Sequence, residues 1–553
     1  MKRMLLAGAL TVSFAGGVWA QTAEELANDT ATPGDVLTYG MGQDQKRFSP
    51  LDQINVDNVS SLTPVWAYSL ADTRGQENFP LIRNGVMYVT THKATIALDA
   101  KTGKQLWKAE IEYPAETPRV ACCGILNRGA ALYDDKLFRT TLDAHVIALN
   151  PENGEEIWRT KAADYKPGYS FTVAPLVVNG VVIVGSSGAE YGTRGFIDGY
   201  DAQTGERLWR RHTIAAPGEP GGDTWPEGDA WQKGGGSAWL TGTYDPELDT
   251  VYWGTGNAGP WNAMVRPGDN LYVTSLLALN PKTGDIKWHY QFTPNDPFDY
   301  DGVNELVLAE IDGKKVVMQA NRNGFFYVLD RTNGELLAAN GFVEDINWAE
   351  KIDLETGRPV LTEVYHKAVS GEEYNLWPGP YGGKNWSPMS YSPDSNTVFI
   401  NTNRYGATMK AIEPEYRAGT FYLAIELAWD YPEDHRGELR AIDPMTGDLK
   451  WSSPTDIPRY SGVMSTGGNL VFTGSLTGEF EAFNAETGDK LWEFNTGSGI
   501  IGQPMTWEMD GKQYVTVVNG LGGVYAIWGG DERLSNVSAG GSVWTFALPG
   551  SDS

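Results

Sequence analysis

The acidic stretch TPNDPFDYDGVNE, at residues 293–305, holds four carboxylates and no lysine or arginine. Its acids are Asp296, Asp299, Asp301 and Glu305. Like charges this close together repel one another, unless turns point them into solvent or a cation binds several of them. In an extended segment residues i and i+2 share a face, so Asp299 and Asp301 are able to face the same ion. The stretch alone leaves both explanations open.

The only two cysteines of the chain, Cys122 and Cys123, are neighbours in the sequence ACCGIL. Two adjacent thiols cannot complete a closed zinc site without further ligands, and no Cys/His spacing pattern accompanies them. The motif CxxCH does not occur, so we expect no c-type haem attached to this chain. The pair is compatible with a vicinal disulfide in an oxidising compartment or with two buried free thiols.

The N-terminal sequence MKRMLLAGALTVSFAGGVWAQ has the form of an export signal. Lys2 and Arg3 precede an apolar run, and Val18 and Ala20 occupy the small-x-small positions before a cleavage site. We therefore expect residues 1–20 to be removed and the mature protein to work in the periplasm, without a membrane span.

The charge of the chain constrains its partners. Loss of Lys2 and Arg3 changes the formal net charge from −27 to −29. Such a charge disfavours binding to nucleic acids and favours basic protein partners. Solubility alone explains an acidic charge that is spread over the whole chain equally well.

A short sequence motif recurs along the chain, and the structure that it forms must position these residues. Six copies end in a tryptophan four residues after a turn glycine, and the seventh has Ala338 there. An Asp or Asn followed by Gly favours a tight turn, because Gly readily adopts positive φ. The seven copies are ALDAKTGKQLW, ALNPENGEEIW, GYDAQTGERLW, ALNPKTGDIKW, VLDRTNGELLA, AIDPMTGDLKW and AFNAETGDKLW, and the tryptophans are Trp107, Trp158, Trp209, Trp288, Trp451 and Trp492.

Hairpins that recur about every 40–50 residues predict an all-β fold, an eight-bladed β-propeller formed by residues 21–553 as a single domain. Seven blades come from the copies of this motif and the eighth from PVWAYSL at Trp66, with VWTFALPG at Trp544 as a closing strand. We interpret the repeated tryptophans as structural residues that dock each blade on its neighbour, since an aromatic of this kind buries ~150–250 Å². The long interval between Ala338 and Trp451 predicts an insertion or a degenerate pair of blades.

Six further motifs follow one another along the chain: CCGILNRG, GSSGAEYGTRG, GGGSAW, GTGNAGPWN, DPFDYDGVNE and NRNGFFYVLDR. Together, and in this order, they make the chain resemble the pyrroloquinoline quinone (PQQ) dependent alcohol dehydrogenases. The resemblance implies a Cys122–Cys123 disulfide as one wall of the PQQ site and Trp239 as the other. Tyr460 departs from the family, where many members have tryptophan. The other residues implied to bind or line the cofactor are Glu77, Arg128, Thr172, Ser187, Gly188, Ala189, Ser237, Arg322, Asn385 and Trp386.

The same resemblance implies a metal ion bound by Glu190, Asn257, Asp299 and Asp301. This oxygen-only set suits a hard cation better than zinc or copper. Calcium-dependent family members usually carry a small uncharged residue in the place of Asp301, so DYD resembles the lanthanide-dependent branch. The alternative is a calcium enzyme in which Asp301 lies beside the ligands without touching the ion. Asp296 and Glu305 are interpreted as turn or surface acids.

The resemblance further implies oxidation of a primary alcohol to an aldehyde, with hydride transfer to PQQ. Asp299 would take the hydroxyl proton, and Arg322 would stabilise charge on the quinone oxygens. Electrons would leave to a separate soluble c-type cytochrome, because no haem motif is present. The alternative from another class is a non-catalytic propeller scaffold, which would need none of these motifs.

The sequence does not identify the alcohol. Phe298, Trp261 and Leu240 are candidates for an apolar pocket beside the quinone. The oligomeric state is equally open, with a homodimer as one alternative.

Overall fold

The structure, a computed structural model, describes residues 22–550, and the predicted signal peptide lies outside the described residues. Strands dominate this part, so the chain is all-β, as the repeats predict. Its three α-helices are short: α1 (Ala23–Ala27), α2 (Glu363–Ser370) and α3 (Gly523–Trp528). None of the described helices is long and apolar enough to cross a membrane.

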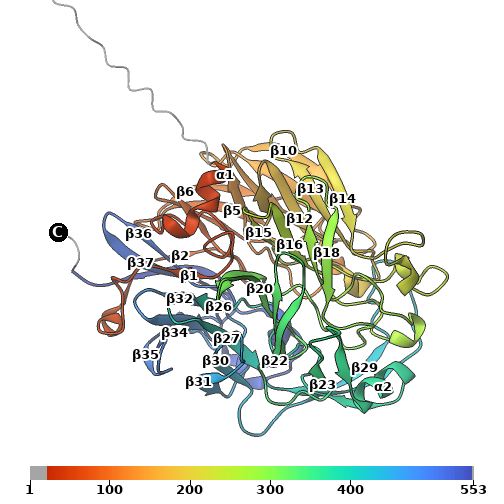
Figure 1. Cartoon of the computed structure of the whole chain (residues 1–553). Helices are drawn as coiled ribbons and strands as arrows, with labels where there is room; N and C mark the ends of the chain where they lie inside the picture. Colours follow the sequence, from red (N-terminus) through yellow and green to blue (C-terminus); the bar gives the residue numbers. More distant parts are fainter. Residues whose placement is uncertain (1–21, 551–553) are drawn as a thin grey trace, which may run out of the picture.

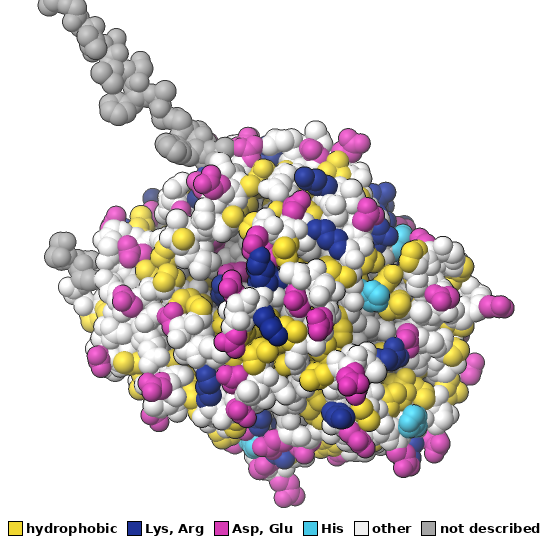
Figure 2. Space-filling model, viewed as in Figure 1, with side chains coloured by type: hydrophobic (Ala, Val, Ile, Leu, Met, Phe, Trp, Pro, Cys, Tyr) yellow, Lys and Arg dark blue, Asp and Glu magenta, His cyan; other side chains and the backbone are white. Residues whose placement is uncertain are grey.

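Acidic side chains are scattered over the face shown in Figure 2, with lysine and arginine between them. The negative charge read from the sequence is therefore not gathered into one patch on that face.

Most of the described strands form seven antiparallel four-stranded sheets and one five-stranded sheet (Figure 1). The first five sheets each use four consecutive strands. They are β3 (Leu81–Arg83), β4 (Val86–Thr90), β5 (Ala94–Asp99) and β6 (Gln105–Glu110); β7 (Ala131–Tyr133), β8 (Lys136–Thr140), β9 (His145–Leu149) and β10 (Glu156–Lys161); β11 (Leu176–Val178), β12 (Val181–Gly185), β13 (Phe196–Asp201) and β14 (Arg207–His212); β15 (Thr243–Asp245), β16 (Thr250–Gly254), β17 (Ser275–Leu279) and β18 (Ile286–Gln291); β19 (Val307–Ile311), β20 (Lys314–Ala320), β21 (Phe325–Asp330) and β22 (Leu336–Gly341).

Two further sheets follow in the chain. One has the order β26 (Ser390–Ser392), β27 (Thr397–Asn403), β30 (Gly437–Ile442) and β31 (Leu449–Thr455). The five-stranded sheet has the order β1 (Phe48–Ser49), β32 (Val463–Thr466), β33 (Leu470–Gly474), β34 (Glu479–Asn484) and β35 (Lys490–Asn495). Its strand β1 pairs parallel to β32, which ties the N-terminal segment to a sheet near the other end of the chain.

The last sheet joins the two ends of the described chain. β2 (Thr63–Ser69) pairs antiparallel with β38 (Ser542–Ala547), the strand predicted to close the fold, and β37 (Lys512–Asn519) and β36 (Met505–Met509) complete the sheet. In Figure 1 red and blue segments meet at this sheet.

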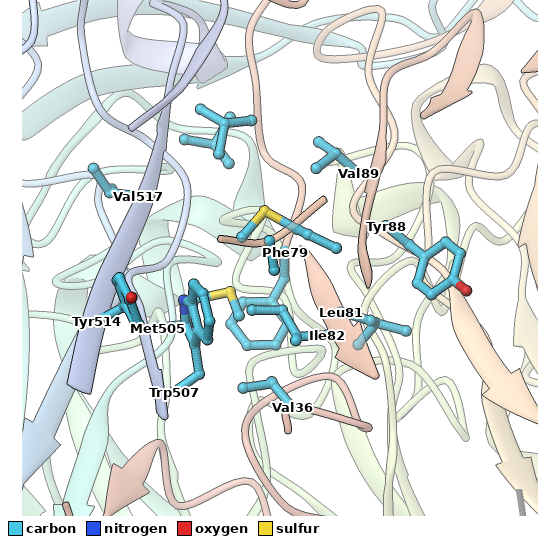
Figure 3. Close-up of a cluster of buried hydrophobic side chains, with 14 of the residues drawn as sticks. Val36, Phe79, Leu81, Ile82, Tyr88, Val89, Met505, Trp507, Tyr514 and Val517 are labelled. Carbon is cyan, nitrogen blue, oxygen red and sulfur yellow. The ribbon is translucent and has the colours of Figure 1, made fainter. Parts of the chain in front are cut away.

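Apolar side chains fill the space between the closing sheet and β3 and β4. Figure 3 shows Met505 and Trp507 beside Leu81 and Ile82, and each of these four side chains is at most 1% exposed. Burial of a large apolar side chain stabilises a fold by about 1.5–3 kcal/mol, so this contact between distant segments helps to hold the ring of sheets closed.

The repeated tryptophans make hydrogen bonds between neighbouring sheets. The indole Nε1 of Trp107 donates to the carbonyl of Pro151 at 3.0 Å, and that of Trp209 donates to the carbonyl of Pro281 at 3.0 Å. The turn glycine of the next repeat lies against the ring, since a Cβ added at Gly205 would come within 2.6 Å of Trp158. The tryptophan of one repeat therefore contacts the turn glycine of the next repeat across the boundary between their sheets.

The copy with Ala338 makes this contact with a smaller side chain. Asn340, two residues later, donates from Nδ2 to the carbonyl of Met445 at 3.1 Å and lies against Gly447 of the next repeat. A polar side chain thus replaces the indole hydrogen bond at the position where the repeat departs from its pattern.

The long interval after Ala338 holds an insertion with two small sheets of its own. β23 (Ala349–Ile352) pairs with β24 (Pro359–Leu361), and β28 (Gly406–Ala411) pairs with both β25 (Tyr374–Leu376) and β29 (Ile425–Asp430). Of the two alternatives that the sequence left open, this matches the insertion.

We predict that Trp209→Ala lowers the free energy of unfolding by about 3–5 kcal/mol, because it empties a buried contact and removes the hydrogen bond to Pro281. Urea unfolding followed by circular dichroism measures the change. Leu208→Ala is the matched control, since Leu208 is 49% exposed and should change the stability by less than about 0.5 kcal/mol. Equal stabilities of the two variants would contradict a role of the indole in joining the sheets.

Candidate active site

The predicted functional residues lie in loops at one end of the sheets. In an antiparallel four-stranded sheet the connection between strands two and three leaves at the same end as the connection to the next sheet. Glu190 in η4 (Ala189–Tyr191), Asn257 and Arg322 occupy the two-to-three connections of three successive sheets. Asp299 and Asp301 lie in the connection from β18 to β19. The repeat order therefore delivers these side chains to one place.

Most of the residues that the motifs single out line one cavity of about 350 Å³. Ala189, Ser237 and Asn257 do not line it, but each is at most 1% exposed and lies next to lining residues in the chain or in space. The predicted residues that line the cavity are Glu77, Cys122, Cys123, Arg128, Thr172, Ser187, Gly188, Glu190, Trp239, Asp299, Asp301, Arg322, Asn385 and Trp386.

Cys122 and Cys123 form the predicted disulfide, which lines the cavity. The two sulfurs and a carboxylate oxygen of Glu190 lie within 4.8 Å of one another. Because the sulfurs are joined in a disulfide, they offer no thiolate to a metal ion, so this trio is not a sulfur-ligated metal site. It shows instead that Glu190 lies against the disulfide wall.

Arg128 is held on the same side of the cavity as Trp239. Its guanidinium pairs with Glu77 at 2.6 Å and donates to Thr172 Oγ1 at 2.5 Å. Its central carbon lies 4.5 Å from the centre of the Trp239 ring and 5.1 Å from that of Trp386. A flat aromatic wall and a fixed cation therefore stand side by side, as a planar, anionic ligand requires.

Arg322 joins the two neighbouring acids of the DYD motif. Its Nη1 donates to Asp299 Oδ2 at 3.0 Å, and its Nη2 lies 2.8 Å from Asp301 Oδ2. The other oxygen of Asp301 accepts a hydrogen bond from the backbone N–H of Asn257 at 2.7 Å. Asp299 has a φ of 66°, a left-handed conformation that is uncommon outside glycine and is often found at functional sites.

Burial makes negative charge unfavourable at this cluster. Burial, with the nearby charge of Asp301, raises the pKa of Glu190 to about 7. Burial raises the pKa of Asp299 well above its usual range, although Arg322 opposes the shift. The pKa of Asp301 is raised for the same reason and is likewise opposed by Arg322. Three acids thus share one guanidinium, and full ionisation requires another cation.

Unpartnered buried polar atoms show that the site fits both a cation and PQQ. Asn257 Oδ1 and Asp299 Oδ1 are acceptors without a donor. The amide oxygen suits a hard cation, and the carboxylate oxygen is open both to a neighbouring cation and to a proton. Ser237 Oγ, Arg128 Nε and Arg322 Nε have no hydrogen-bond partner, and they suit carboxylate or carbonyl oxygens. The disulfide and Trp239 line the same cavity. Together these groups match what a planar quinone with three carboxylates needs.

Two acids of the opening stretch, interpreted as turn or surface acids, are both buried, so the surface alternative is wrong for both. Asp296 is 1% exposed, and its carboxylate accepts from the backbone N–H groups of Phe298 and Tyr300 at 3.0 and 3.1 Å, so it does stabilise a turn. Glu305 is 3% exposed, because it pairs with Lys384 at 2.8 Å and accepts from the Met389 N–H.

The apolar part of the cavity was largely missed by sequence reasoning. Of the three candidates, Trp261 lines the cavity, whereas Phe298 and Leu240 do not. They are buried behind the lining, Phe298 in the same apolar cluster as Trp261 and Leu240 in that of Trp386. Tyr460 also lies outside the lining, with its hydroxyl 2.6 Å from that of Tyr405. The lining residues that were missed are Leu126, Pro380, Tyr381, Phe421, Leu423, Ile425, Leu427, Trp429, Val524 and Trp528.

The alternating sequence IELAWD, at residues 425–430, is a signal that could have found some of them. Residues i, i+2 and i+4 of a strand share a face, so Ile425, Leu427 and Trp429 form an apolar stripe.

Comparisons with known proteins agree with this site. The family model of the "Glucose/ethanol/alcohol dehydrogenase, beta-propeller domain" of PQQ proteins matches residues 37–340 and 424–515. The quinoprotein alcohol dehydrogenase PedH of Pseudomonas putida is 44% identical over 99% of this chain and 96% of its own length. The 1-butanol dehydrogenase (quinone) of Thauera butanivorans is 38% identical, over 99% of this chain and 98% of its own.

Solved structures give the same result. A europium-containing methanol dehydrogenase matches with a TM-score of 0.90 and 34% identity, over 95% of this chain and 100% of its own. The quinohemoprotein alcohol dehydrogenase of Comamonas testosteroni matches with a TM-score of 0.89 and 37% identity, over 96% of this chain and 84% of its own. Similarity of this extent to so many members shows that the chain belongs to the PQQ-dependent alcohol dehydrogenases.

Proposed function

We propose that this PQQ-dependent alcohol dehydrogenase oxidises primary alcohols to aldehydes with a lanthanide ion in the site. The observation that carries the proposal is the buried cluster of Glu190, Asp299 and Asp301 around a single guanidinium, that of Arg322, with two oxygen acceptors left without donors. Bound PQQ would supply a two-electron acceptor, and the cation would supply Lewis acidity.

Asp299 is the proposed catalytic base. Its Oδ2 is held by Arg322, whereas its Oδ1 has no partner and is the atom that would receive the hydroxyl proton. Arg322 lowers the pKa of a carboxyl that burial otherwise raises, and a bound cation would lower it further. The base is therefore ionised only when positive charge surrounds it.

PQQ would be held by the cavity wall described above. Arg128 and Arg322 each have an Nε without a partner to offer to its oxygens. The disulfide and Trp239 would enclose its plane. The residues proposed to bind or line it are Glu77, Cys122, Cys123, Arg128, Thr172, Ser187, Gly188, Ala189, Ser237, Trp239, Arg322, Asn385 and Trp386.

Charge balance favours a trivalent ion at Glu190, Asn257, Asp299 and Asp301. Three buried carboxylates exceed the single guanidinium by two charges, before any cofactor carboxylate is added. The similarity to a europium-containing methanol dehydrogenase supports the same choice.

A calcium site is the second candidate, and one observation favours it. Both carboxylate oxygens of Asp301 already have donors, one from the Asn257 N–H and one from Arg322. If those contacts are retained, Asp301 would lie beside the ligands without binding the ion. The remaining ligands would then carry less negative charge, which suits a divalent ion.

The setting of the reaction is also proposed. We propose that the seven four-stranded sheets and the five-stranded sheet are eight propeller blades, docked through tryptophan in one domain, residues 21–553. We also propose that the protein works in the periplasm. A soluble c-type cytochrome would accept the electrons. Relatives called quinohemoproteins support a haem acceptor, since their name joins the quinone with haem.

We expect Asp299→Asn to lower kcat by ~10²–10⁴-fold, because the amide cannot accept the hydroxyl proton. Dye-linked oxidation of ethanol by protein loaded with PQQ and lanthanum measures the loss, and circular dichroism checks the fold. Asp489→Asn, which changes an exposed turn acid, is the control and should keep wild-type kcat. An Asp299→Asn variant with near-wild-type kcat would remove Asp299 from the mechanism.

For Asp301, we expect high activity of the PQQ-loaded protein with lanthanum and low activity with calcium. A trivalent ion gains more from an additional anionic oxygen than a divalent ion does. Asp301→Ala should lose most of the lanthanum-supported activity while retaining a folded propeller. Equal wild-type activity with the two ions, or full lanthanum activity of Asp301→Ala, would favour the calcium site.

The binding of cations should depend on pH near neutrality. The pKa of Glu190 is about 7 in the cation-free protein, so below pH 7 a proton competes with the ion for this carboxylate. We expect the affinity for terbium, measured by luminescence, to fall between pH 7.5 and 5.5, by about tenfold per pH unit for each displaced proton. Glu190→Gln should bind more weakly and with a shallower pH dependence. An affinity that is the same at both pH values would contradict this assignment.

A further inference from the structure

We infer that the cavity selects primary alcohols that carry an extended apolar tail; this inference rests on the proposed function and names its substrate class. The cavity has two chemically different halves. Every charged side chain of its lining belongs to the site already described, at Glu77, Arg128, Glu190, Asp299, Asp301 and Arg322. The other half is lined by side chains of the insertion and of α3, and none of these is charged.

Strand β29 provides one apolar wall. Its residues Ile425, Leu427 and Trp429 alternate along the strand and all line the cavity, whereas Glu426 and Ala428 between them do not. Leu427 is still 38% exposed, so the stripe continues from the cavity to the surface. Trp429 packs on Tyr381, with the ring centres 4.4 Å apart, and so extends the wall toward the charged half.

Aromatic side chains from the loop before β29 and from α3 form an exposed rim of the cavity. Phe421 stacks on Tyr191, the residue after Glu190, with ring centres 5.0 Å apart and an interplanar angle of 18°. Trp528 of α3 meets Phe421 edge-on at 6.4 Å. Phe421 and Trp528 are 48% and 44% exposed, an unusual exposure for side chains of this size unless they meet a ligand or partner.

The loop that carries Phe421 is anchored to the site itself. The backbone N–H of Tyr422 donates to the carbonyl of Glu190 at 2.7 Å, and the N–H of Trp261 donates to the carbonyl of Leu423 at 2.9 Å. These bonds hold the apolar rim at a fixed place relative to Asp299 and its neighbours. A tail that enters this space therefore meets preformed walls, which lowers the entropy lost on binding.

The arrangement orients the substrate by polarity. The hydroxyl group must reach Asp299, so the rest of the alcohol extends into the uncharged half of the cavity. An apolar tail would displace water from Leu427, Trp429 and Trp528, which is favourable. A second hydroxyl or a charge on the tail would lose its hydration beside side chains that offer it no partner.

The test compares alcohols of increasing length on the holoprotein, loaded with PQQ and lanthanum. We expect kcat/KM to rise by about fourfold for each methylene from ethanol to 1-hexanol, the factor that burial of one methylene gives. We expect 1,6-hexanediol to lie at least tenfold below 1-hexanol, because its second hydroxyl would face the apolar walls.

Leu427→Gln probes the wall, and Leu449→Gln, at a leucine that is 52% exposed on the outer strand β31, is the matched control. We expect the ratio of kcat/KM for 1-hexanol to that for ethanol to fall about tenfold in Leu427→Gln and to stay unchanged in Leu449→Gln. A second readout is independent of turnover: 1-hexanol should quench tryptophan fluorescence of the cofactor-free protein at lower concentration than ethanol, and Leu427→Gln should reduce this difference.

A kcat/KM that is flat along the alcohol series, or a Leu427→Gln variant with the wild-type ratio and fluorescence response, would overturn the inference. Failure of the proposed function has a different signature, in which the loaded holoprotein oxidises no alcohol, ethanol included. Preferential binding of 1-hexanol in the fluorescence titration would in that case still support an apolar-tail site.

Discussion

The structure depends on the burial of three carboxylates beside one guanidinium. Asp299 and Asp301 share Arg322, and Glu190 lies close enough to feel their charge. In a low-dielectric site all three carboxylates stay ionised only beside a compensating cation. Without the cation, some of them take up protons. The raised pKa values of these acids therefore favour the binding of positive charge, and they link the proposed metal ion to the ionisation of Asp299, the proposed catalytic base.

The ring of sheets holds the three acids together despite their mutual repulsion. Its members come from separate loops, so each must be fixed by the sheet that carries it. Tryptophan and glycine meet across the sheet boundaries, and β38 pairs with β2 to tie the ends of the chain. The resulting rigidity lets Asp299 keep an uncommon backbone conformation and lets Asn257 and Arg322 hold Asp301 from two sides.

The sequence predicts the repeated part of the molecule well, because a hairpin that recurs reveals its strands, turn and interior residue at once. It also predicts the disulfide and most of the charged cavity wall, since these residues lie in specific motifs. It fails where burial depends on distant partners: Glu305 is buried because Lys384 neutralises it, and nothing near Glu305 in the chain shows this. It also fails for much of the apolar rim, because Phe421 of the insertion and Trp528 of α3 come from segments outside the repeat and show no pattern of their own.

We propose that a cation completes the charge balance of the buried acids. The most direct test is an anomalous difference map from crystals of the protein with PQQ and samarium, recorded near the samarium edge. We expect one strong peak bounded by Glu190, Asn257, Asp299 and Asp301. An oxygen of Asp301 should be released from its present donor and bonded to the ion. A site without a peak, with Arg322 alone facing the acids, would contradict it.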